Sequence, residues 1–95
     1  MAGRAAEAAG LLKALAHEGR LMILCHLATG ERSVTELEEL IGARQAAVSQ
    51  QLARLRSEGL VNARRDGKAI YYSIKDPKAG AIMALVYDMF CNPAN

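Results

Sequence analysis

The sequence predicts a mainly α-helical domain that carries a single two-stranded β-hairpin. Apolar residues recur every three or four positions over most of the 95 residues, which is the spacing of amphipathic helices. Capping residues and glycines divide this pattern into short helices. Between residues 60 and 74 the pattern changes to the alternation typical of strands, on both sides of an Asp-Gly pair.

Three helices are predicted before the middle of the chain. The first covers 5–15, and the second runs from about 18 to 27 and stops before a glycine. The third opens at Ser33, where Glu36 lies at the spacing of a capping box, and ends at Gly42, which suits the left-handed position after a helix. Their apolar faces are formed by Leu11, Leu12 and Leu15, by Leu21, Leu24, Cys25 and Ala28, and by Leu37, Leu40 and Ile41.

The stretch 42–60, GARQAAVSQQLARLRSEGL, predicts one further helix with two different faces. One face is an apolar stripe of Val48, Leu52 and Leu55. The other face carries no carboxylate and combines small residues, amides and a cation. Amides can hydrogen-bond to adenine edges, small residues let a helix lie deep in a groove, and cations contact phosphate. This second face consists of Gln45, Ala46, Ser49, Gln50, Ala53 and Arg56.

Only a few residues separate this helix from the third one, which predicts a helix-turn-helix unit. We expect Gln45, Ser49 and Gln50 to face base edges of double-stranded operator DNA, and Arg44 and Arg56 to contact phosphate. A module whose helix-turn-helix contacts protein instead of DNA is an alternative, because an ordinary solvated helix also has an apolar stripe.

The predicted hairpin is basic near its tip. The strand-like runs LVNARR and KAIYYSI flank Asp66-Gly67, and both of these turn residues tolerate positive φ. A basic hairpin directly after a helix-turn-helix is a wing, so the predicted fold is a winged helix-turn-helix. Its cations, Arg64, Arg65 and Lys68, should lie against phosphate or in the minor groove.

Asp76-Pro77 should start the last helix, with the aspartate as cap and the proline in the first turn. This helix is apolar over more than one face, and a chain of this size leaves much apolar surface exposed. A second copy of the chain is the economical partner, so we expect a homodimer through the first and last helices. The apolar residues of the last helix are Ala81, Ile82, Leu85, Val86, Met89 and Phe90.

Bulk properties restrict the classes of function. The net charge of +2 is small, so nucleic-acid binding would depend on how the charges are distributed. No apolar run is long enough to cross a bilayer and no secretory signal is present, so we expect a cytoplasmic protein without a membrane partner. No nucleophile with a base and an orienting group is visible, which argues against an enzyme, and we expect no cofactor.

The segment AVSQQLARLRSEGLV followed by RRDGKAIYYSI resembles the winged helix-turn-helix of the ArsR/SmtB repressor family. The resemblance covers nearly the whole chain. It implies a homodimeric bacterial repressor that leaves operator DNA when an inducer binds or reacts. Arg44 stands where the family usually has a serine at the start of the recognition helix, which exchanges a helix cap for a phosphate contact.

Many members of this family sense metals, but their common ligand motifs are missing here. The third helix, VTELEELIG, has no cysteine, and the last helix, AGAIMALVYDMFC, offers Asp88 but no histidine. We therefore expect no metal site. A site built from His17, Cys25, Cys91 and Asp88, and hence a metal-responsive repressor, remains an alternative.

The two cysteines of the chain lie in ILCHLATGERSV and MFCNP. Taken alone, both could be small core residues, because free cysteine is among the most buried residue types. Their placement, however, resembles the sulfide- and persulfide-responsive branch named after SqrR and BigR. The resemblance implies that persulfide, polysulfide or oxidant chemistry links Cys25 to Cys91 within one subunit. Sequence does not determine the distance between them, and so leaves open whether the link is a disulfide or a longer polysulfide.

Overall fold

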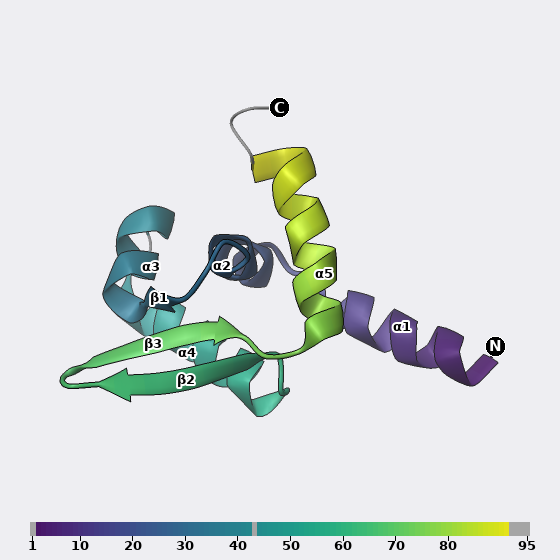
Figure 1. Cartoon of the computed structure of the whole chain (residues 1–95), viewed down its shortest axis with the longest axis horizontal. Coiled ribbons are helices and arrows are strands. Elements are labelled where there is room, and N and C mark those ends of the chain that lie inside the picture. Colours follow the sequence, from purple (N-terminus) through teal and green to yellow (C-terminus); the bar gives the residue numbers. More distant parts are fainter. Residues whose placement is uncertain (1, 43, 92–95) are drawn as a thin grey trace.

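The computed structural model describes residues 2–42 and 44–91. Over these residues the chain forms a winged helix-turn-helix of five α-helices, one π-helical turn and a small antiparallel sheet (Figure 1). The predicted fold class is confirmed. The elements are α1 (Ala2–Leu15), α2 (Glu18–Leu27), β1 (Arg32–Ser33), α3 (Val34–Ile41), α4 (Gln45–Ser57), β2 (Val61–Asp66), β3 (Ala69–Ile74), α5 (Pro77–Val86) and the π turn Tyr87–Cys91.

The core lies where α2, α3, α4 and α5 meet the base of the hairpin. The predicted stripe of α4 is buried, with Val48 at 2% exposure and both Leu52 and Leu55 at 0%. Each such side chain contributes roughly 1.5–3 kcal/mol by leaving water. The expected burial of Leu40 is wrong. Leu37 takes the inward position of the short α3, and Leu40 is 47% exposed.

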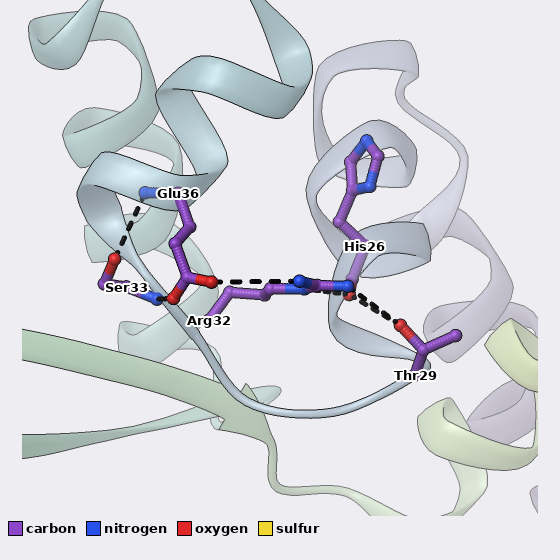
Figure 2. A network of polar contacts seen from close by, with 5 residues as sticks. All are labelled: His26, Thr29, Arg32, Ser33 and Glu36. Carbon is purple, nitrogen blue, oxygen red and sulfur yellow. Dashed lines mark hydrogen bonds and ion pairs between the residues drawn. The ribbon is translucent and has the colours of Figure 1, made fainter.

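Local capping sets the boundaries of α3 and α4. The Ser33 hydroxyl accepts from the Glu36 backbone N–H at 3.1 Å, and the Glu36 carboxylate accepts from the Ser33 N–H at 2.9 Å (Figure 2). The predicted capping box is therefore confirmed. Gly42 has φ 74° and ends α3, and Arg44 is extended, so α4 begins at Gln45 and the stretch from 42 is not one continuous helix. Residue 43 of that stretch lies outside the described residues.

The sheet has the order β1-β3-β2, one strand more than the predicted hairpin. Strand β1 pairs through Arg32 with Tyr72, a partner 40 positions away for which no local signal exists. The hairpin register ends with Asp66 opposite Ala69. Its two turn residues are therefore Gly67 and Lys68, one position later than predicted, and only the glycine takes a positive φ, of 63°.

Helices α1 and α5 leave the body of the molecule in different directions, and the N-terminal end of α1 projects into open space (Figure 1). Of the residues in α1, only Leu15 is buried. Helix α5 starts as predicted, with the Asp76 carboxylate accepting from the Lys78 backbone N–H at 2.8 Å. Within the described residues, no helix has the length and apolarity needed to cross a membrane.

Candidate DNA-binding surface and cysteine pair

The face of α4 opposite its buried stripe is open to solvent. Gln45, Ser49 and Gln50 are all exposed, and residues four apart on a helix lie on the same side. The alanines between them, Ala46 and Ala53, are exposed as well. This face therefore combines flat amide groups with small neighbours, as close approach to base edges in a major groove requires.

Cations border this face at both ends. Arg44 is the N-terminal flanking residue of α4, and its side chain makes no capping hydrogen bond. The first N–H groups of a helix together form a partly positive site that suits phosphate. Within residues 2–42 and 44–91, no ion pair holds any of four exposed cations, namely Arg44, Arg56, Arg65 and Lys68.

Arg64, the remaining cation of the wing, is engaged within the chain. Its Nη2 and Nε donate to the two carboxylate oxygens of Glu31 at 2.7 and 3.0 Å. Its guanidinium also lies 5.0 Å from the centre of the Tyr71 ring, within the range of a cation–π contact. The hydrogen bond from Arg64 lowers the pKa of Glu31 below its ordinary value. Among the described residues, Arg64 is therefore already paired with a carboxylate, whereas no ion pair holds Arg65.

The two cysteines meet although 66 positions separate them. Cys25 lies on α2 and is 8% exposed, whereas Cys91 ends the π turn and is exposed. The thiol of Cys91 donates to Cys25 Sγ across 3.4 Å. This is a non-bonded contact, because a disulfide would bring the sulfurs to about 2.05 Å. Both residues are free thiols.

The environments of the two sulfurs differ. Burial, followed by the hydrogen bond and the charge of Cys91, raises the pKa of the Cys25 thiol to about 12. Cys25 therefore keeps its proton near neutral pH, and only the thiolate form of a cysteine is a strong nucleophile. The exposed Cys91 is the sulfur that a reagent from solvent meets first.

Both cysteines line a groove of about 1010 Å³ between α2 and the end of α5. Its walls are largely apolar and include Leu21, Met22 and Phe90, together with Leu40. His26 also lines the groove, and burial followed by the charge of Arg32 lowers the pKa of its imidazole. The groove therefore connects the sulfurs with solvent through a mainly apolar passage.

Metal-ligating side chains are not gathered here. Over the part of the chain that the structure describes, no three His, Cys, Asp or Glu side chains lie close enough together to hold a metal ion. The predicted alternative of a zinc-type site from His17, Cys25, Cys91 and Asp88 thus finds no geometric support among these residues.

Comparisons with known proteins agree with this geometry. Residues 17–63 match the family model described as bacterial regulatory protein, arsR family. The biofilm growth-associated repressor of Agrobacterium fabrum is 48% identical over 98% of this chain and 80% of that protein. The chain belongs to the ArsR family.

Solved structures extend the likeness to the whole ArsR-family fold. BigR from Xylella fastidiosa is 47% identical, with a TM-score of 0.87 over 96% of this chain and 90% of that one. A structure described as reduced HlyU from Vibrio cholerae is 40% identical, with a TM-score of 0.88 over 97% of each chain. The family model ends within β2, but these structures also cover α5, which leads to the second cysteine.

This ArsR-family chain exposes apolar side chains on the two helices that were expected to form a dimer. Leu12 on α1 is 53% exposed, and on α5 and the turn after it Leu85, Met89 and Phe90 are 58%, 55% and 80% exposed. The Lys78 ammonium contacts the Glu7 carboxylate at 2.7 Å and links the two helices within one chain. Large apolar side chains exposed on two linked helices are typical of an interaction site.

Two residues of this ArsR-family site have no signal in the sequence. Glu31 and Arg32 follow each other in a short connection, and neither belongs to a motif. Their roles depend on partners elsewhere: Glu31 contacts Arg64, which is 33 positions away, and Arg32 pairs with β3.

Proposed function

We propose that this ArsR-family chain is a transcriptional repressor that binds operator DNA as a homodimer and is released when Cys25 and Cys91 become linked. The observation that carries the proposal is the 3.4 Å contact between the two sulfurs. Relatives named as repressors support the regulatory part. A solved relative described as reduced HlyU is consistent with a chain whose redox state matters.

In the proposed complex, α4 enters the major groove. Gln45, Ser49 and Gln50 contact base edges, and Arg44 and Arg56 contact phosphates on either side. Arg65 and Lys68 at the tip of the wing contact phosphate or the minor groove. Arg64 can join them only by exchanging its carboxylate partner Glu31 for a phosphate.

The proposed dimer buries the exposed apolar residues of α1, α5 and the π turn. A two-fold dimer presents two copies of α4 to two half-sites about one helical turn apart. The distance between the two copies depends on how α2 and the helix-turn-helix sit relative to α5. A change at the junction of α2 and α5 therefore alters the distance between the two copies of α4 and weakens the contacts with both half-sites together.

The first step of the proposed chemistry takes place at the exposed sulfur. The Cys91 thiol loses its proton to solvent, and the thiolate attacks the outer sulfur of a persulfide donor RSSH. The product is a Cys91 persulfide, and RS⁻ leaves and takes up a proton as RSH. The groove beside the sulfurs provides access for the donor.

In the second step the Cys25 sulfur attacks Cys91 Sγ and gives up its proton as it does so, because the free thiol is protonated near neutral pH. The outer sulfur leaves as hydrosulfide and takes up the proton of Cys25, so the products are a disulfide and H₂S. If a second donor has first converted Cys25 into a persulfide, the same displacement gives a trisulfide and H₂S. With peroxide, Cys91 becomes a sulfenic acid, and attack by Cys25 releases water.

Mass spectrometry combined with operator release tests this proposal. The reduced protein is treated separately with a persulfide donor and with peroxide, and the mass and the fraction of bound duplex are followed in time. A link between the two cysteines that forms at the rate of DNA release supports the proposal. Release without a link, or a link without release, would overturn it. Weak binding of duplex with no salt dependence would indicate a protein-interaction module instead.

A further inference from the structure

The side chain of Arg32 bridges the end of α2 and the start of α3 (Figure 2). Its Nε donates to the backbone oxygen of His26 at 3.3 Å, and its Nη2 donates to the Thr29 hydroxyl at 3.3 Å. Its Nη1 lies 3.8 Å from the carboxylate of Glu36. One planar guanidinium therefore contacts both the end of α2 and the first turn of α3.

Each end of this network reaches a site described above. His26 directly follows Cys25, so its carbonyl belongs to the turn of α2 that carries the buried sulfur. Glu36 forms the capping box of α3 with Ser33, and α3 packs against α4. One polar path from Cys25 towards α4 thus runs through Arg32 and Glu36, beside the direct packing of α2 against α3 and α4.

The other connections between α2 and α3 fix the relative orientation of the two helices less well. The backbone between them passes through Gly30, at φ 141°, a conformation that glycine adopts freely. Apolar packing also joins the two helices, since Leu24 of α2 and Leu37 of α3 both belong to the buried core, but such packing is non-directional. Hydrogen bonds weaken steeply when they are misaligned, and a guanidinium with three partners fixes both position and orientation.

We propose that Arg32 is a positioning residue that transmits a change at the Cys25–Cys91 pair to α3 and α4. When a link pulls the Cys25 turn of α2 towards the end of α5, the His26 carbonyl moves with it. Arg32 and Glu36 then shift the start of α3, and with it α4. This inference rests on the proposed function, because it assumes that the linked and reduced forms differ in operator affinity.

The test compares operator affinity of the reduced and linked forms in variants of Arg32. The linked form is prepared with diamide, which takes up two electrons and the two thiol protons to give a disulfide and the corresponding hydrazine. Mass spectrometry verifies that each variant is linked to the same extent. The quantity of interest is the ratio of the two dissociation constants, not either value alone.

For the unmodified protein we expect linkage to weaken binding by a factor in the range of about 5 to 150. In Arg32→Met the reduced form should bind within about threefold of the original, because only a partly exposed ion pair and its hydrogen bonds are lost. The ratio should fall towards one. Arg32→Lys keeps the charge but not the planar fork, and should give an intermediate ratio.

Arg20→Met is the matched control. Arg20 also lies on α2, donates to the backbone oxygen of Ala14, and contacts the Glu58 carboxylate beyond α4, but it lies away from the Cys25 turn. We expect it to leave the ratio close to that of the original protein, because the reduced and linked forms lose the same partly buried pair.

Three results separate the possible failures. The role of Arg32 would be overturned if Arg32→Met kept the same ratio of dissociation constants as the unmodified protein. It would also be overturned if Arg20→Met lowered that ratio as much as Arg32→Met does. A ratio of one in the unmodified protein would instead overturn the proposed function on which the inference rests. A decrease confined to the Arg32 variants, with unchanged linking and melting temperature, supports the inference.

Discussion

Glu31 binds Arg64 through two hydrogen bonds, so the connection after α2 holds a cation of the wing. In the proposed complex, phosphate competes with this carboxylate. Arg64 and Arg65 are neighbours in the chain, yet only Arg65 is free of such a partner among the described residues. The two arginines should therefore respond differently to changes in their surroundings.

Glu31→Gln should strengthen DNA binding on every sequence by about two- to fivefold, the scale of one exposed ion pair. It removes the carboxylate that competes for Arg64, so the slope of log affinity against log salt should steepen by up to roughly one unit. Titration of specific and random duplexes at several salt concentrations measures both quantities. The effect should vanish in the double variant with Arg64→Met. Unchanged affinity and slope in Glu31→Gln would show that the ion pair with Glu31 does not keep Arg64 from contacting phosphate.

Gln50→Ala should weaken binding to the operator by about 1–3 kcal/mol while leaving affinity for random DNA nearly intact. Gln50 is exposed on the face of α4 that carries the amides, so its removal takes away base contacts and no core packing. Arg65→Met serves as the contrast and should weaken both kinds of binding. An equal loss on operator and random DNA in Gln50→Ala would remove this residue from base readout.

Cys25→Ser and Cys91→Ser should each bind operator normally and remain bound when a persulfide donor is added. A link needs two cysteines, so neither variant should release the operator when the donor is added. Fluorescence anisotropy of a labelled duplex measures this release. Full release of Cys91→Ser would mean that modification of Cys25 alone is sufficient. If both variants were released, neither thiol would be the sensor.

Alkylation of the two thiols should differ strongly with pH. Only thiolate reacts, and the pKa of Cys25 is raised to about 12, so its protonated form dominates at every pH below that value. The alkylation rate of Cys25 in the folded protein should therefore rise by about tenfold per pH unit between pH 8 and 11. Peptide mass spectrometry after brief iodoacetamide pulses measures the rate, with Cys91 as the internal reference. A rate that levels off near pH 9 would contradict the raised pKa.

Leu85→Glu should give a folded monomer. Leu85 is 58% exposed in the single chain, so the substitution leaves the core intact, but it places a carboxylate in the proposed dimer contact. Sedimentation velocity measures the oligomeric state and circular dichroism the fold. Ile70→Glu, a matched change at an exposed residue of the wing, should remain dimeric. A dimeric Leu85→Glu protein would place the interface elsewhere.

Local signals were sufficient to predict most of the fold. The Ser33–Glu36 capping box, the Asp76 cap and the α4 stripe each depend on residues within one or two helical turns, and each was confirmed. The misses arise from partners far away in the chain. Strand β1 exists only because β3 pairs with it, and Leu40 is exposed because tertiary packing, not periodicity, selects the inward side of a short helix.

The site was predictable in residue type more than in arrangement. Exposure of Gln45, Ser49 and Gln50 follows from helical spacing once α4 is identified. The engagement of Arg64 does not, because nothing near Glu31 distinguishes it from other surface acids. The cysteine pair was expected only through resemblance to a family, since two thiols 66 positions apart carry no information about their distance.

The π turn at Tyr87–Cys91 sets the direction in which Cys91 points around the helix axis, as well as its position along that axis. A π turn holds more residues than an α turn, so residues beyond Val86 sit at a different angle around the axis from those of an unbroken α-helix. Deleting one residue within α5 would rotate the thiol by about 100° away from α2. A chain could then keep both cysteines and still lose the pair. The number of residues between Asp76 and Cys91 therefore matters to the proposed sensor as much as the presence of the cysteine. Searches for similar chains should compare this number as well as the two cysteines.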